Sequence, residues 1–124
     1  MEFSKKPYHS SLAWQKADDF VLLVYRVTVT FPDYEKYNCT SQLRRAALSI
    51  PLNIVEGMAR STTKEYLRFL YIARGSCMEC SYLLEVSYKL RYLDETTYKQ
   101  AESLRREVSY FLQRSMSSLQ GPKE

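Results

Sequence analysis

The sequence predicts an all-α fold, an up-and-down antiparallel four-helix bundle. Apolar residues recur at spacings of three and four along most of the chain, the pattern of helices that each bury one face. Only three glycines and four prolines occur in 124 residues, too few for the many turns of a β-sandwich or barrel. Four long helical stretches joined by short connections therefore favour a single bundle domain over residues 1–124.

The first two helices have clear boundaries in the sequence. After a flexible lead-in over residues 1–10, we expect a helix over about residues 11–30, where apolar residues recur from Trp14 onward. Phe31 and Pro32 stop it, because a residue that precedes proline avoids helical geometry. The second helix is expected over about residues 40–59, with Thr40 or Ser41 as its N-cap.

The last two helices begin with capping signals. Thr62 is followed three residues later by Glu65, the spacing of a capping box, and this predicts a third helix over about residues 63–91. Asp94 is expected to cap a fourth helix over about residues 95–119. Gly121 and Pro122 are residues that commonly follow a helix end.

The second predicted helix carries apolar residues on two faces. At about 100° per residue, Leu43 shares one face with Ile50 and Ile54, whereas Leu48, Leu52 and Val55 lie on the other. The second face predicts a further neighbour, which in so short a chain is another copy of the protein, with Leu48, Leu52 and Val55 in the interface. The alternative is a central helix buried on both faces within one chain.

Two glycines lie inside predicted helices, Gly57 in the second and Gly75 in the third. Each costs about 1 kcal/mol relative to alanine. We expect the two helices to approach closely near both residues, which would compensate for this loss. The alternative is that each glycine is a tolerated local weakness.

Composition limits the possible functions. The longest apolar run, residues 20–25, is too short to cross a membrane, and the chain does not open with a signal peptide, so we expect a cytoplasmic protein. Three cysteines fit a reducing compartment better than a disulfide framework. A net charge of +4 is a mild bias that permits an acidic partner such as RNA.

The sequence lacks the residues that most enzymes need. His9 is the only histidine, so neither a catalytic triad nor the Glu-x-x-His pairs of a bundle metal enzyme can form. Cys77 and Cys80 have C-x-x-C spacing, but they lie in mid-helix on the core side, where buried structural thiols are the favoured interpretation over zinc or redox sites. We therefore expect no catalytic residue, metal, cofactor or small-molecule substrate.

Several short motifs occur together in one order. They are Trp14-Gln15-Lys16-Ala17, Gln42-Leu43-Arg44-Arg45-Ala46-Ala47, Ser49-Ile50-Pro51, Asn53-Ile54-Val55-Glu56-Gly57 and Ala73-Arg74-Gly75-Ser76. Together they resemble a known family, the four-helix-bundle proteins encoded in intervening sequences of bacterial 23S ribosomal RNA genes, over about residues 11–118. The resemblance implies a cytoplasmic bacterial protein that forms a ring-like homopentamer. A related branch serves as the accessory protein of diversity-generating retroelements, binds nucleic acid through a basic surface and associates with a reverse transcriptase.

The motifs also place a carboxylate and a guanidinium on neighbouring helices. Glu56 lies on the flank between the two apolar faces of its helix, and the family motif places Arg74 on the next helix. We interpret Glu56 and Arg74 as a buried polar pair that fixes helix register rather than as catalytic groups.

Basic residues are the one functional lead. Arg44, Arg45, Lys64 and Arg68 are the candidate phosphate contacts of a nucleic-acid-binding accessory protein, and a ring of copies would add up their fields. Further positive charge on the fourth helix is expected from Arg105, Arg106 and Arg114. The alternatives are an ordinary solvated surface, and a structural or adaptor oligomer that binds a protein partner. The 11 tyrosines suit subunit interfaces and, less so, base stacking.

Overall fold

A computed structural model describes residues 1–121 and contains four α-helices, with no strand in that range. Two 3-10 turns, η1 (Pro7–Ser10) and η2 (Asp33–Glu35), precede the first two long helices. The α-helices are α1 (Leu12–Thr28), α2 (Cys39–Met58), α3 (Thr63–Lys89) and α4 (Glu95–Gln120). These bounds lie close to the predicted ranges. Gly121 follows α4 with a φ of 72°, as a helix-ending glycine should, and the predicted role of Pro122 lies outside the described residues.

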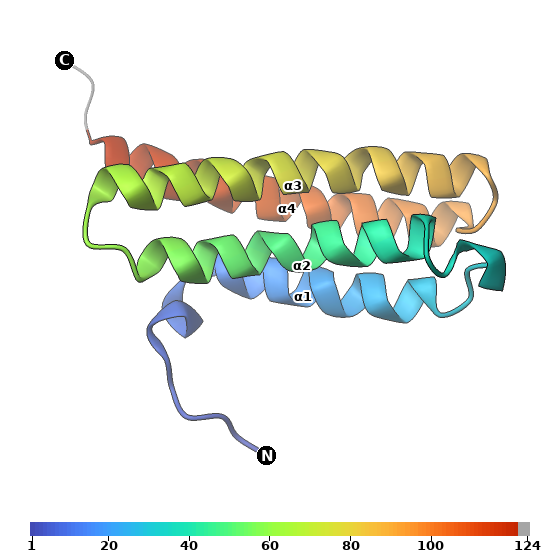
Figure 1. Cartoon of the computed structure of the whole chain (residues 1–124), viewed down its shortest axis with the longest axis horizontal. Helices are drawn as coiled ribbons and strands as arrows, with labels where there is room; N and C mark the ends of the chain where they lie inside the picture. The colour runs from blue at the N-terminus through green and yellow to red at the C-terminus, as the bar shows by residue number, and fades with distance from the viewer. Residues whose placement is uncertain (122–124) are drawn as a thin grey trace.

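The helices form the predicted up-and-down bundle. Helix α1 packs against α2 and α4, and α3 packs against the same two helices, so that the four stand at the corners of a square. Figure 1 shows the α2–α3 turn at one end of the bundle and the two other connections together at the opposite end. None of the helices within residues 1–121 carries an apolar stretch long enough to span a lipid bilayer.

Three of the four helices begin with a side-chain cap. The Thr62 hydroxyl accepts a hydrogen bond from the Glu65 N–H at 3.2 Å, and the Asp94 carboxylate accepts one from the Thr97 N–H at 2.7 Å, as predicted. The prediction that Thr40 or Ser41 caps α2 was wrong. Helix α2 begins earlier, at Cys39, and the carboxylate of Glu35 accepts from the Cys39 N–H at 3.4 Å.

The core is a continuous column of buried apolar side chains from all four helices. Pro51 is buried inside α2, and the helix continues through it. The largest completely buried side chains include Phe20 from α1, Ile54 from α2, Leu84 from α3 and Leu112 from α4.

The two mid-helix glycines have opposite surroundings. A Cβ on Gly57 would lie 2.8 Å from Cδ1 of Tyr66 and 3.0 Å from Cβ of Phe69, so the predicted close approach of α2 and α3 is confirmed there. The prediction for Gly75 was wrong, because a Cβ on Gly75 would meet no atom within 4 Å. Helix α3 turns this glycine to the outside of the bundle.

One polar cluster ties the two connections at the end of the bundle together. The Tyr92 hydroxyl donates a hydrogen bond of 2.6 Å to the carboxylate of Glu35, and the rings of Tyr92 and Phe31 lie 5.4 Å apart. This hydrogen bond from Tyr92, together with those from Cys39 and Asn38, holds the pKa of Glu35 below its ordinary value. No local sequence pattern indicates this contact, because its partners are 57 residues apart.

Candidate functional site

Basic side chains gather at the turn between α2 and α3. Lys64 and Arg68 lie one helical turn apart near the start of α3, both exposed, and neither forms an ion pair within residues 1–121. Arg60, just after α2, is also exposed, and its guanidinium lies 4.7 Å from the centre of the Phe69 ring. We call Arg60, Lys64 and Arg68 the turn cluster.

The other two predicted phosphate contacts lie elsewhere on the molecule. Ser49 of α2 contacts Ser76 of α3, with 2.9 Å between their hydroxyl oxygens, which fixes the antiparallel register of the two helices. In that register Arg45 lies about 18 Å along the bundle from Arg68, at 1.5 Å per residue. The structure therefore does not bring the four predicted residues into one site.

Arg44 is engaged within the chain. Its Nε donates to the Thr28 hydroxyl at 2.8 Å, and its guanidinium lies 4.8 Å from the centre of the Tyr25 ring. Half-buried and bound to α1 in this way, it is less available to a phosphate than the exposed Arg45, which borders the groove between α2 and α3.

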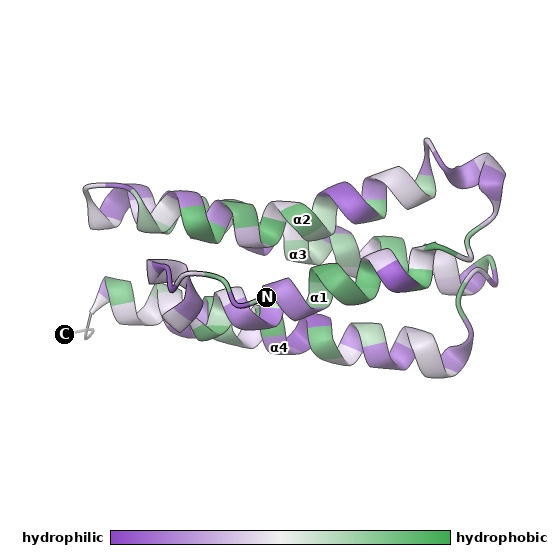
Figure 2. Cartoon of the chain, turned by 90° about the horizontal axis from the view of Figure 1, so that it is seen from below, coloured by the Kyte–Doolittle hydropathy of each residue, from purple (hydrophilic) through white to green (hydrophobic). Residues whose placement is uncertain are grey.

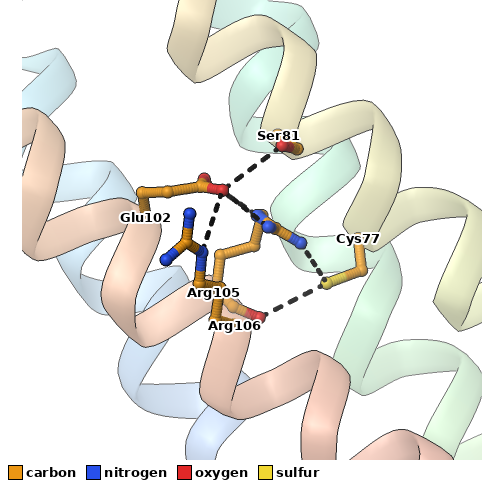
Figure 3. A network of polar contacts seen from close by, with 5 residues as sticks. All are labelled: Cys77, Ser81, Glu102, Arg105 and Arg106. Atoms are coloured by element: carbon orange, nitrogen blue, oxygen red, sulfur yellow. Dashed lines mark hydrogen bonds and ion pairs between the residues drawn. The ribbon is translucent and has the colours of Figure 1, made fainter.

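Arg105 is a core residue, contrary to the prediction that it adds surface charge. Its side chain forms two hydrogen bonds with the carboxylate of Glu102, at 2.6 and 2.9 Å (Figure 3). Its Nη1 also lies 3.7 Å from the sulfur of Cys77, and the Ser81 hydroxyl donates to Glu102 at 3.4 Å. Arg105 is only 8% exposed, and the carboxylate of Glu102 raises its pKa.

The two other cations predicted to strengthen the surface of α4 are partly neutralised or stacked. Nε of Arg106 lies 3.8 Å from Glu102. The guanidinium of Arg114 lies over the Tyr110 ring and donates to its hydroxyl at 3.1 Å. Helix α4 is therefore a weaker candidate for nucleic-acid contact than the start of α3.

The predicted buried pair of Glu56 and Arg74 was also wrong. Both residues are exposed, and no ion pair joins them in the described part of the chain. Arg74 lies instead over the Tyr71 ring, 5.0 Å from its centre. The buried ion pair of this bundle is Glu102–Arg105, which connects α4 to the thiol of Cys77 on α3.

The two cysteines of the C-x-x-C motif are buried, as predicted. Burial raises the pKa of both the Cys77 and the Cys80 thiol, which makes them poor nucleophiles and poor metal ligands. Within residues 1–121, no three His, Cys, Asp or Glu side chains are grouped so that they could hold a metal ion.

The second apolar face of α2 is uncovered. Leu48 is 39% exposed, Leu52 is 55% exposed, and Val55 is half-buried, so the alternative of a helix buried on both faces within one chain is wrong. The partly exposed Tyr25 of α1 lies beside this face, because Arg44, one turn before Leu48, contacts its ring and its backbone carbonyl. Figure 2 shows α1 and α2 side by side, with hydrophobic residues on both ribbons through the middle of the bundle.

Comparisons with known proteins agree with this fold. No curated protein matches the chain. A crystal structure of a protein of unknown function, from the S23 ribosomal protein family of Bacteroides thetaiotaomicron VPI-5482, superposes with a TM-score of 0.77. It is 20% identical and the match covers 86% of this chain and 99% of that one, which supports the fold alone.

A family match covers most of the chain. Residues 9–114 match the family described as 23S rRNA-intervening sequence protein. These residues run from η1 through all of α1, α2 and α3 and into the last third of α4, so the match includes the core of the bundle. The chain belongs to the family of 23S rRNA-intervening sequence proteins.

Proposed function

We propose that the protein is a non-enzymatic, self-associating bundle that binds RNA through the phosphate groups, using the turn cluster of each copy. The observation that carries the proposal is the pair Lys64 and Arg68, both exposed and without an acidic partner in the described residues. Lys64 occupies the first turn of α3, where the positive end of the helix dipole disfavours a cation. A bound phosphate would relieve this unfavourable interaction.

Self-association is the second part of the proposal. One copy offers only three clustered cations, which is a weak electrostatic site. Several copies, five by the family resemblance, would bring the same cluster together several times and so raise the local potential. The uncovered face of Leu48, Leu52 and Val55 supports such an assembly, because contiguous exposed apolar surface on a small protein commonly marks an interface.

A salt series tests the RNA-binding role. The affinity for a fluorescently labelled RNA hairpin, measured by anisotropy, should fall steeply between 50 and 200 mM salt, the range over which counterion release is large. The double variant Lys64→Ala/Arg68→Ala should lower the log–log slope by about 1.4 to 1.8 for each copy in contact, at roughly 0.7 to 0.9 per phosphate.

A matched control separates a local site from general charge. Lys89→Ala/Lys99→Ala removes two exposed positive charges that lie beside Glu85 and Glu95, and it should leave the slope nearly unchanged. Equal losses in the two double variants would contradict a site at the turn. Absence of RNA binding at low salt would instead favour the alternative function, an adaptor oligomer with a protein partner.

A further inference from the structure

The outer side of α3 carries an apolar stripe with a glycine at its centre. Tyr71, Ile72, Met78 and Tyr82 are 42, 43, 62 and 65% exposed. Residues 71, 75, 78 and 82 follow the spacing of one helix face, and Ile72 lies beside them. We call these five residues the Gly75 face.

No contact within residues 1–121 explains the glycine. Gly57 allows Tyr66 and Phe69 to approach α2, whereas a Cβ on Gly75 would meet no atom within 4 Å. A mid-helix glycine is unfavourable relative to alanine. Its useful property is that a second backbone or a large side chain can approach the helix more closely there.

We propose that the Gly75 face receives the second apolar face of α2, formed by Leu48, Leu52 and Val55, from another copy of the chain. This inference rests on the self-association proposed above and identifies the surface that the α2 face contacts. Both are stripes of exposed apolar residues two to three turns long, on different helices. Contact between two different faces is heterologous, so each copy still has one free face of each kind, and a closed ring satisfies them all.

Charge sets the direction in which the two helices cross. The α2 face has Arg45 toward its N-terminal end and Glu56 toward its C-terminal end. The Gly75 face has the opposite order of charges: the guanidinium of Arg74 lies over Tyr71 in its N-terminal half, and Glu79 and Glu85 lie toward its C-terminal end.

An antiparallel crossing satisfies these charges. With Leu52 over Gly75, Arg45 lies opposite position 82, between Glu79 and Glu85. Glu56 lies opposite Tyr71, whose ring carries the guanidinium of Arg74. A parallel crossing would place Arg45 beside Arg68 and Glu56 beside Glu79, which are like charges. Complementary charges favour the antiparallel arrangement.

Cysteine cross-linking tests the contact directly. In the antiparallel crossing, Met78 lies opposite position 49 and therefore next to Leu48. Two single variants of the full chain, Leu48→Cys and Met78→Cys, are mixed, allowed to exchange subunits and oxidised. The mixture should give a species of twice 14.6 kDa on a non-reducing gel, and neither variant should do so alone. The native cysteines are buried and contribute no background.

A substitution at the glycine tests the close approach. A Cβ on Gly75 would meet no atom of the described chain within 4 Å, so the Gly75→Leu variant should keep its helical circular dichroism. Its subunit affinity should nevertheless fall on the order of 10- to 100-fold, because the added side chain overfills the contact. Ser103→Leu places the same side chain on the exposed surface of α4 and should leave the assembly unchanged.

The outcomes distinguish this inference from the function on which it depends. If wild-type protein assembles but the mixed cysteine variants do not cross-link, or Gly75→Leu assembles normally, the α2 face has another partner and the inference is wrong. Cross-linking of Leu48→Cys with itself would show an isologous dimer and would also overturn it. Loss of RNA binding in Gly75→Leu with unchanged mass would assign this face to RNA. A wild-type mass of 14.6 kDa would reject both proposals.

Discussion

Neutralising Glu102 should destabilise the bundle strongly, because it leaves a buried cation without its partner. The Arg105 and Glu102 side chains are 9 and 13% exposed, and the Glu102→Gln substitution leaves the guanidinium with one amide oxygen and the distant sulfur of Cys77. Removal of one member of a buried pair typically costs 3–5 kcal/mol. We expect about 3 kcal/mol, the low end, because the amide oxygen still accepts a hydrogen bond.

This loss is large enough to be measured by thermal unfolding. With an unfolding entropy of about 2.1 cal/mol/K per residue, each kcal/mol moves the Tm of a 124-residue chain by about 4 °C. Glu102→Gln should therefore lower the Tm by about 12 °C, followed by circular dichroism at one fixed protein concentration, since assembly also adds to stability.

Two further variants show whether burial is the cause. Glu95→Gln removes a carboxylate from the exposed pair with Lys99 and should cost no more than about 0.5 kcal/mol. Glu102→Gln/Arg105→Met removes both buried charges and should recover most of the stability lost by the single variant. If Glu102→Gln and Glu95→Gln have similar effects, the reasoning from burial is refuted.

Three other predictions concern separate parts of the bundle. Gly57→Ala should lower the free energy of unfolding by about 1–3 kcal/mol despite the better helix propensity of alanine, because the alanine Cβ would lie 2.8 Å from the Tyr66 ring. Urea unfolding measures this loss, and a gain in stability would contradict the packing described. Tyr92→Phe removes the hydrogen bond that lowers the pKa of Glu35. Because the folded pKa is lowered, this hydrogen bond stabilises the fold fully above the ordinary pKa of 4.5, and its contribution is lost as the pH falls through the pKa of the folded state. The difference in unfolding free energy between wild type and Tyr92→Phe should therefore be constant near neutral pH and shrink below pH 4.5, and a difference that grows in acid would show the sign to be wrong. Cys80 should react with a thiol reagent only after unfolding, and rapid labelling of native protein would contradict its burial.

The fold could be predicted because its signals are local. Helical periodicity, the caps at Thr62 and Asp94 and the scarcity of glycine act within a few residues of each position, so they are visible in the sequence. Both faces of α2 are apolar, and in the structure the face that contains Leu48 and Leu52 is the uncovered one.

The site was harder to predict because its contacts join distant residues. Arg105 lies on the stripe of Ala101, Val108 and Leu112, a spacing that could have identified it as a core position, but its partner Cys77 is known only once α3 and α4 are packed. Arg44 binds Thr28 across two helices, and the surroundings of Gly75 depend on the rotation of α3. None of these contacts follows from spacing within one helix.

The mass of the chain in dilute solution tests the central claim most directly, namely that the exposed face of α2 is covered by another copy. Light scattering should give at least twice 14.6 kDa for the wild type and a value near 14.6 kDa for Leu52→Glu, which places a charge in that face. A wild-type mass of 14.6 kDa at the same concentration would contradict the account.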